Sequence, residues 1–183
     1  MDGDSIIMIL IMITLTACSA FFSATETAYL SFNQAKMKTL AASGDKRAQM
    51  VLSLYNDYDR LITSVLVGNN IVNISLSSIS TVLFIKFLGD MGATVSTVII
   101  TVIVLIFGEI TPKTVSKDFA ESFALSTVYA VKAVILIFYP LSFIFGLRQK
   151  LVDRISNPPG ESTVTEDEII TLVDEAEEGG GID

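Results

Sequence analysis

Polar side chains occur at helical spacing within two apolar stretches of this sequence. Ser19, Ser23 and Glu26 are spaced i, i+4 and i+7, so two hydroxyls and a carboxylate share one helical face. Asn69 and Asn73 are four residues apart in a later stretch and share a face in the same way. Two more polar residues lie within a wider arc of that second helix, namely Asn70 and Ser64. Because polar groups are costly within a membrane, they usually face the interior of a helix bundle.

A third polar group ends another apolar stretch, in the sequence IFGEITPK at residues 106 to 113. Pro112 has no N–H group, so the carbonyl of Gly108, four residues earlier, loses its helical donor. We expect Pro112 to turn Thr111 away from helical torsion angles and Gly108 to allow close approach of a neighbour or ligand. Glu109 places a carboxylate beside the freed carbonyl. At membrane depth such a break is tolerated only where it is buried in protein or lines a cavity.

These groups together offer hydroxyl, amide, backbone and carboxylate oxygens. Hard oxygen ligands suit Mg²⁺, Ca²⁺ or Na⁺, whereas zinc and copper favour histidine or thiolate. The chain has no histidine, and its one cysteine, Cys18, lies in an apolar run where we expect it to pack as a small hydrophobic residue. Small and amide residues also join membrane helices without binding an ion, which is the simpler interpretation of any single serine. Three such groups on three stretches favour a cation site.

The composition indicates an integral membrane protein. Of the 183 residues, 51% are hydrophobic, and the mean hydropathy is +0.61. The net charge of −8 arises at the carboxyl end, where residues 161 to 183 contain nine acidic side chains and no basic one. The lack of a basic patch argues against a nucleic-acid partner. Asp2 and Asp4 occupy the region where a secretory signal would be basic, so we interpret the first apolar stretch as a retained span.

Four apolar segments can be drawn, at residues 5 to 29, 61 to 87, 93 to 110 and 123 to 147. A bilayer core requires about 20 helical residues, so the first two segments are long enough and the third is barely so. The fourth contains Lys132 and Pro140, which is compatible with a kinked span or with a helical hairpin in the interface.

The polar segment between the first two spans, residues 31 to 60, is basic and contains two amphipathic stretches separated by a turn at Gly44 and Asp45. Its basic side chains are Lys36, Lys38, Lys46, Arg47 and Arg60. Basic loops remain in the cytoplasm, which favours three crossings with the amino end outside and the carboxyl end cytoplasmic.

We divide the chain into a transmembrane domain (residues 1 to 155), a proline-containing linker (156 to 163) and an acidic helix (164 to 183). Thr165 and Glu168 form a capping box at the start of that helix. Its short apolar stripe predicts packing on a second copy or on a further soluble domain of a longer natural protein, and the alternative is a solvated helix.

Three motifs in this order, FFSATETAYLS, GNNIVN and FGEITPK, resemble the transmembrane domain of the CorC and cyclin M (CNNM) family of magnesium transporters. The resemblance implies an all-α integral membrane fold with three transmembrane helices and a juxtamembrane helical hairpin, followed by an acidic cytoplasmic helix. It also implies a multi-pass homodimer in the plasma membrane that exports Mg²⁺, coupled to Na⁺. The family continues into CBS domains that bind ATP. With the hairpin, the fourth apolar segment would fold back at or near Pro140.

Carried over residue by residue, the family motifs fall on Ser19 and Ser23, on Gly68, Asn69 and Asn73, and on Gly108, Glu109 and Pro112. The predicted Mg²⁺ ligands are Ser19, Ser23, Asn69, Asn70, Asn73, Gly108 and Glu109. We expect Glu26 and Ser64 to line the pathway or a Na⁺ position, and Pro112 to form the structural break. Lys113 would mark the cytoplasmic end of this break, pair with a nearby acid, or anchor the helix in the interface.

Two other functions are compatible with these residues. A membrane-embedded sensor or scaffold would bind Mg²⁺ without moving it and signal through the acidic helix to soluble domains. An intramembrane hydrolase would use Ser23 or Ser64 as nucleophile and Lys132 as base. Nothing in the spacing brings Lys132 near either serine, so we expect no enzymatic activity.

Overall fold

The computed structural model describes residues 2–156, with side chains over residues 2–140, and every regular element in that range is helical. The chain divides into two compact units, Met1–Phe145 and Gly146–Asp183. The first unit holds all the predicted site residues. The predicted acidic helix, and the predicted linker apart from Ser156, lie outside the described residues.

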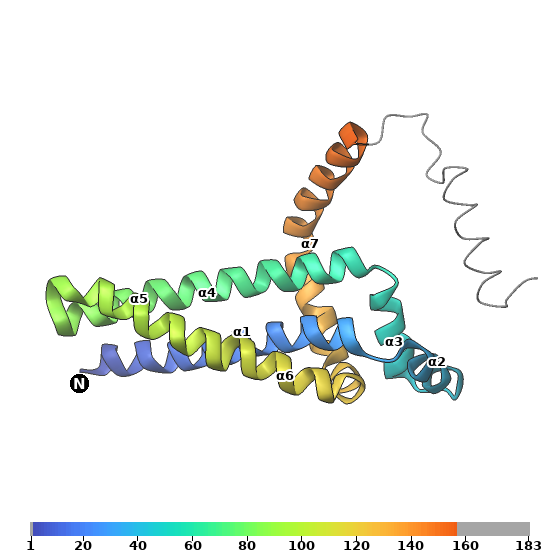
Figure 1. Ribbon diagram of the computed structural model, residues 1–183, viewed down its shortest axis with the longest axis horizontal. Coiled ribbons are helices and arrows are strands. Elements are labelled where there is room, and N and C mark those ends of the chain that lie inside the picture. Colours follow the sequence, from blue (N-terminus) through green and yellow to red (C-terminus); the bar gives the residue numbers. More distant parts are fainter. Residues whose placement is uncertain (1, 157–183) are drawn as a thin grey trace, which may run out of the picture. The chain divides into compact units, whose positions relative to one another are not determined.

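Three long helical stretches form an antiparallel bundle in the first unit (Figure 1). They are α1 (Gly3–Ser31), α4 (Tyr58–Leu88) and the continuous run of α5 (Gly92–Ile103), η2 (Val104–Ile110) and α6 (Thr111–Asp118). Helix α1 contacts α4 on one side and both η2 and α6 on the other, so it lies between the other two stretches. This arrangement brings the three predicted polar groups, one from each stretch, into a single bundle.

The chain reverses at Gly89, between the second and third stretches. Residues Tyr58–Asp118 are apolar enough to be one candidate span of 61 residues, but a straight helix of that length would extend roughly 90 Å, about three times a bilayer core. Gly89 has φ +61°, which favours glycine, and the short 3₁₀ helix η1 (Gly89–Met91) turns the chain so that α5 packs on α4. With α1, the fold thus has three crossing segments, as predicted.

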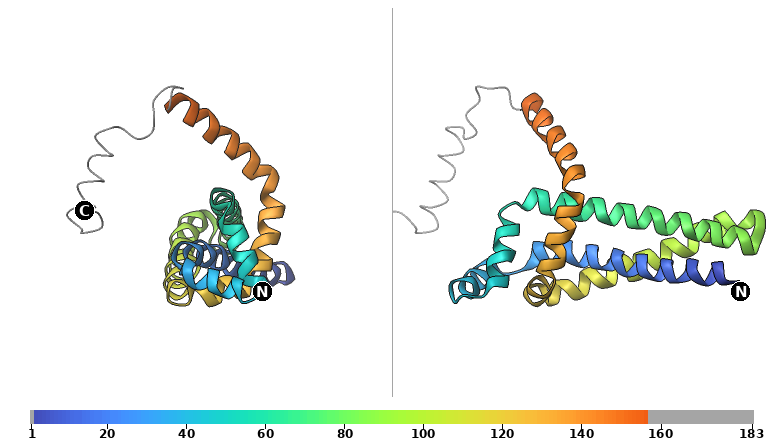
Figure 2. Two further views of the ribbon diagram at one scale, coloured as in Figure 1. Left: turned by 90° about the vertical axis from the view of Figure 1, so that its right-hand side faces the viewer. Right: turned by 180° about the vertical axis from the view of Figure 1, so that it is seen from behind.

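A short helical hairpin lies at the end of the bundle where α1 ends and α4 begins (Figure 2). Helix α2 (Gln34–Ala42) starts at Asn33, whose side chain accepts a hydrogen bond from the backbone N–H of Lys36. Helix α3 (Lys46–Tyr55) starts at Asp45, which caps it in the same way. The predicted turn at Gly44 joins the two helices, where a φ of +97° requires glycine. The two predicted amphipathic stretches and the turn between them are therefore present, and this hairpin is distinct from the juxtamembrane hairpin predicted at residues 123 to 147.

Helix α7 (Ala120–Ser156) continues through Pro140, so the predicted chain reversal near Pro140 is wrong. A proline within a helix removes one hydrogen bond and can kink the helix, but it does not by itself turn the chain back. One face of α7 is buried at spacings of three and four residues, at Ala120, Ala124, Val128, Val131 and Ile135.

That buried face packs on one end of the bundle. Its core partners are Phe22, Ala28, Tyr29 and Phe32 at the end of α1, together with Met37, Ala48 and Val51 of the hairpin and Leu61 and Val65 of α4. A fourth crossing helix would contact its neighbours along their whole length. Residues 120–140 instead cover one end and run across α1 and α4 in both views (Figures 1 and 2), although their composition alone would allow a span.

The opposite end of the bundle is closed by an ion pair between the start of α1 and the end of α4. Lys86 pairs with Asp2, and Ser5 donates a hydrogen bond to the same carboxyl group. These two contacts lower the pKa of Asp2 from 3.8 to about 2, with the Lys86 contact as the largest cause. Asp2 therefore stays ionised at any physiological pH.

Candidate functional site

The centre of the site is a hydrogen-bonded polar cluster in the seam between α1 and α4. The Ser19 hydroxyl donates to the side-chain oxygen of Asn69 at 3.1 Å. The Asn73 amide donates to the same oxygen at 3.4 Å. Ser19 is fully buried, although both helices expose apolar side chains over most of their surface. The structure therefore brings together the first two polar groups as the helical spacing predicts.

The third stretch joins this cluster through Gly108. A Cβ atom built on Gly108 would lie 2.9 Å from the Ser19 hydroxyl oxygen and 3.4 Å from the Ser19 Cβ atom. Only a residue without a side chain allows the η2 backbone to approach α1 this closely. Gly108 is buried in consequence. Three segments far apart in the sequence thus meet around Ser19.

Two oxygen atoms in this region are buried and lack a hydrogen-bond partner, the Ser23 hydroxyl oxygen and the Asn73 side-chain oxygen. Ser23 is one helical turn beyond Ser19 on the same face of α1, and it is fully buried. Leaving a polar group buried without a partner costs about 1–3 kcal/mol. Native proteins therefore rarely retain two such atoms in one region unless a ligand, an ion or water completes their contacts.

The third stretch widens into a π-helix over Val104–Ile110 instead of breaking. The N–H of Thr111 donates to the carbonyl of Ile106, five residues earlier, and Thr111 has φ −62° and ψ −49°. The prediction that Pro112 turns Thr111 out of helical torsion angles is therefore wrong. A wider turn relieves the clash between the proline ring and the carbonyl four residues before it, so the helix can continue.

The missing N–H of Pro112 still removes a donor in this wider turn. Its helical partner would be the carbonyl of Phe107 in π-helical pairing or that of Gly108 in α-helical pairing. One of these two carbonyls therefore lacks that donor, next to the buried contact of Gly108 with Ser19. Single π-helical turns are rare and occur often at functional sites.

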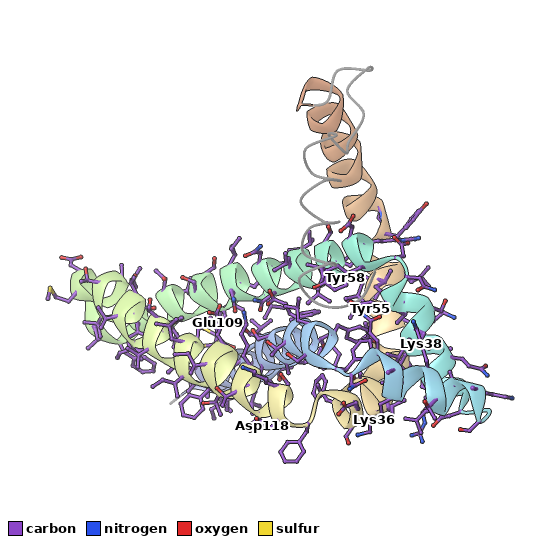
Figure 3. All side chains as sticks on the ribbon, turned by 45° about the vertical axis from the view of Figure 1, so that its right-hand side comes forward. Lys36, Lys38, Tyr55, Tyr58, Glu109 and Asp118 are labelled. Carbon is purple, nitrogen blue, oxygen red and sulfur yellow. The ribbon has the colours of Figure 1, made fainter. Side chains whose placement is uncertain are left out.

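Glu109 and Asn70 take different positions relative to the cluster. Glu109 is half-buried on η2, partway along the bundle (Figure 3). Asn70 is exposed on α4, and no contact among the described residues joins it to Ser19, Asn69 or Asn73. One residue step on a helix is a rotation of about 100°, which carries Asn70 away from the face that Asn69 shares with Asn73.

Glu26 and Lys113 form an ion pair between α1 and α6, with Oε2 and Nζ 3.0 Å apart. Pairing with a nearby acid was one of the alternatives predicted for Lys113. Glu26 lies one turn beyond Ser23 on the α1 face predicted from the spacing. Ser64, the other predicted pathway residue, is fully buried, and its hydroxyl donates to the carbonyl of Arg60.

Gly68 has a packing role that the sequence did not reveal. A Cβ atom built on it would lie 2.7 Å from the ring of Phe22 and 3.1 Å from that of Phe138. The glycine of the GNNIVN motif therefore makes room for two aromatic rings rather than for an ion. The motif itself was the only signal, because helical spacing cannot show which side chain a glycine accommodates.

The arrangement does not support the hydrolase alternative. Ser23 and Ser64 are fully buried within the bundle. Lys132 is exposed on α7, adjacent to the buried residue Val131 but outside the stripe that packs on the bundle. Among the described residues, no contact links this lysine to either serine.

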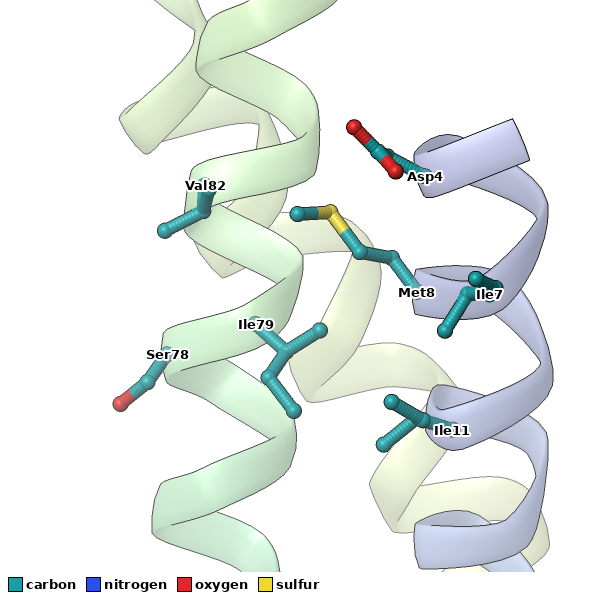
Figure 4. Close-up of a pocket in the computed structure, with 7 residues that line it drawn as sticks. All are labelled: Asp4, Ile7, Met8, Ile11, Ser78, Ile79 and Val82. Carbon is teal, nitrogen blue, oxygen red and sulfur yellow. The ribbon is translucent and has the colours of Figure 1, made fainter. Parts of the chain in front are cut away.

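A separate apolar groove of about 470 Å³ lies between the first half of α1 and the second half of α4 (Figure 4). It is lined mainly by Ile7, Met8, Ile11, Ile79 and Val82. Asp4 is at its edge. Such a lining suits hydrocarbon chains and offers no set of cation ligands. In residues 2–140 as a whole, no three His, Cys, Asp or Glu side chains lie close enough together to hold a metal ion.

Comparison with known proteins gives a consistent set of relatives. A family model described as the cyclin M transmembrane N-terminal domain matches residues 9–183. A UPF0053 protein of Haemophilus influenzae is 33% identical over 96% of this chain and 43% of its own length. The UPF0053 inner membrane protein YfjD of Escherichia coli is 30% identical over 86% of this chain and 38% of its own.

A more distant relative has a name that describes an activity. The polyamine export protein of Haemophilus influenzae is 25% identical over 94% of this chain and 42% of its own length. This chain spans about two fifths of the length of each of these three relatives.

Proposed function

The chain belongs to the cyclin M transmembrane domain family of multi-pass membrane proteins, and from this premise we propose that it transports Mg²⁺ across the membrane. The proposed direction is export coupled to inward movement of Na⁺. The proposed ion site lies where α1, α4 and η2 meet. Its ligands are oxygens of Ser19, Ser23, Asn69, Asn73 and Glu109, together with the backbone near Gly108.

The observation that carries this proposal is the pair of buried, unpartnered oxygens on Ser23 and Asn73. They flank the hydrogen-bonded pair of Ser19 and Asn69. The Ser19 oxygen donates in this pair and keeps its acceptor lone pairs, whereas the Asn69 oxygen accepts two hydrogen bonds, one of which a bound ion would replace. Mg²⁺ prefers six oxygen ligands in octahedral order and retains some water. Neutral oxygens with one carboxylate would hold the ion weakly enough to release it, which transport requires. Asn70 is left out of the proposed ligand set because it is exposed.

The exposed position of Asn70 supports a homodimer. An amide facing lipid in the middle of a membrane helix is unfavourable, and contact with a second helix would satisfy its hydrogen bonds. We propose that a second copy covers this part of α4. The exposed cations of the α2–α3 hairpin, among them Lys38 and Lys46, support a cytoplasmic location for this end of the bundle and an amino end outside.

Replacing Pro112 with alanine should weaken Mg²⁺ binding, although Pro112 itself is not a ligand. Alanine restores an N–H group, which can donate to the carbonyl of Gly108 and draw the wide turn back to an α-helix. We expect about a fivefold loss of Mg²⁺ affinity, measured by isothermal titration, without loss of thermal stability. Unchanged affinity would show that the proline serves helix packing only.

Polyamine transport is a second candidate, favoured by the name of one relative. A polyamine carries several ammonium groups, and buried hydroxyl and amide oxygens can accept their hydrogen bonds. A polyamine and Mg²⁺ require different transport pathways. A long polycation needs several acidic side chains along its path, whereas Mg²⁺ needs one compact set of oxygen ligands. Among residues 2–140 no three His, Cys, Asp or Glu side chains cluster, so the described site suits the small ion better.

Flux measurements decide between these functions. The protein is reconstituted into liposomes that contain a Mg²⁺-sensitive dye, with and without a Na⁺ gradient, and uptake of labelled spermidine is measured in parallel. Mg²⁺ flux that depends on Na⁺ supports the proposal, and spermidine flux without Mg²⁺ flux supports the second candidate. Mg²⁺ binding without any flux would instead identify a sensor or scaffold that signals to soluble domains.

A further inference from the structure

The Glu26–Lys113 ion pair differs from the other ion pairs in the part of the chain that the structure describes. It alone has both partners within segments that could cross the membrane. The other pairs have at least one member in a cap, in a loop or in the hairpin: Lys36–Glu121, Arg47–Asp45, Arg60–Asp57 and Lys86–Asp2. Glu26 lies within the first apolar segment, and Lys113 lies three residues beyond the end of the third. A carboxylate in an apolar segment is costly without a partner, so its pairing requires a reason beyond surface solubility.

The position of the pair relates it to the polar cluster. Helices α1 and α6 run in the same direction, because α4 is antiparallel to both. From the contact between Ser19 and Gly108, Glu26 is seven residues further along α1 and Lys113 is five residues further along the third stretch. These steps correspond to about 10 Å and about 7 Å along the two helices. The pair therefore lies between the cluster and the end of the bundle that carries the hairpin.

The pair is also accessible. The Lys113 side chain is 42% exposed and that of Glu26 is 22% exposed. A buried structural pair would be enclosed by packing, whereas an ammonium group that is nearly half exposed can leave its carboxylate without unpacking the bundle. The carboxylate is the more enclosed of the two groups, so it stays in the bundle when the ammonium leaves.

We propose that Lys113 is a tethered counter-ion, which a metal cation displaces from Glu26 on its way between the hairpin end of the bundle and the polar cluster. This inference rests on the proposed transport function. Glu26 attracts the cation and shares its charge, while Lys113 occupies the carboxylate when no cation is present. Lys113 thus lowers the affinity of Glu26 for cations. It also prevents the Glu26 carboxylate from remaining unpaired in an apolar segment when no cation is bound.

Opposite effects of the two single substitutions test this role. Replacing Lys113 with methionine removes the competing charge, so the apparent Mg²⁺ affinity should rise about fivefold. Replacing Glu26 with glutamine removes the attracting charge and leaves the ammonium, so the affinity should fall about fivefold. If the pair only fastens α6 to α1, both substitutions should weaken binding in the same direction and in proportion to their loss of thermal stability.

The measurement is Mg²⁺ titration of the purified chain in detergent, with thermal unfolding in Mg²⁺-free buffer to compare stability. Lys36→Met is the matched control, because it breaks an exposed ion pair near the same end of the bundle, and it should leave the affinity unchanged. Lys113→Gln keeps a donor for Glu26 without the charge, and it should also bind Mg²⁺ more tightly.

The outcomes separate the two proposals. Wild-type protein that does not bind Mg²⁺ overturns the transport proposal and this one with it. Wild-type binding with the same direction of change in Glu26→Gln and Lys113→Met overturns the counter-ion role alone. Tighter binding by both lysine variants and weaker binding by Glu26→Gln supports it.

Discussion

Replacing Asn69 with leucine should reduce Mg²⁺ affinity about 100-fold and abolish flux. The Asn69 oxygen accepts hydrogen bonds from both Ser19 and Asn73, so it links the two helices of the seam. Leucine has a similar size but no polar atom, so it removes one proposed ligand and leaves two donors without an acceptor. Each loss costs about 1–3 kcal/mol, and about 1.4 kcal/mol corresponds to a tenfold change in affinity. Titration with Mg²⁺ and the liposome assay both measure the effect.

Asn70→Leu is the matched control, because it makes the same chemical change at the next residue of the same helix. Asn70 is exposed and has no contact with the cluster, so its Mg²⁺ affinity should remain within about twofold of the wild-type value. Its oligomeric state is a second measurement, since loss of the exposed amide should weaken the proposed dimer. Equal loss of Mg²⁺ binding in both variants would contradict the assignment of the ion to the α1–α4 seam.

Helical spacing predicted much of this seam but could not choose between neighbouring residues. It placed Ser19 with Ser23, and Asn69 with Asn73, because residues four apart share a face. It also included Asn70, since a broad polar arc is compatible with several orientations of the helix. Only the packing of α1 on α4 determines which part of that arc is buried. The lack of hydrogen-bond partners for the Ser23 and Asn73 oxygens depends on the same packing, so it could not be predicted from the sequence.

The two errors in the fold concern proline. At Pro112 we expected a break, and at Pro140 a chain reversal, whereas both residues lie within continuous helical runs. Proline removes one hydrogen bond and adds a local clash, and a helix can absorb both by widening or kinking. Whether it does so depends on the packing of the flanking residues. Before Pro140, the helix is held on the bundle by the buried apolar face that ends at Ile135. Sequence patterns do not show whether this packing energy exceeds the cost of the hydrogen bond that the proline removes.

Replacing Gly108 with alanine should destabilise the bundle and abolish high-affinity Mg²⁺ binding. The new Cβ atom would lie 2.9 Å from the Ser19 hydroxyl oxygen and 3.4 Å from the Ser19 Cβ atom. The hydroxyl must therefore move away from Asn69, or η2 must move away from α1. Overpacking of this kind costs about 1–3 kcal/mol, which exceeds the 0.5–1 kcal/mol, roughly, that alanine gains over glycine in a helix. Thermal unfolding and Mg²⁺ titration measure the two effects.

A second substitution separates the packing effect from the loss of a ligand. In Gly108→Ala with Ser19→Ala, the hydroxyl that clashes with the new methyl group is absent, so thermal stability should return to near the wild-type value. Mg²⁺ affinity should remain low, because Ser19 no longer supplies an oxygen and Asn69 has lost a donor. Gly3→Ala is the control for the substitution itself, since nothing lies within 4 Å of a Cβ atom there. If the double variant regained both stability and Mg²⁺ affinity, Gly108 and Ser19 would form a packing contact only, and the ion would have to bind elsewhere in the bundle.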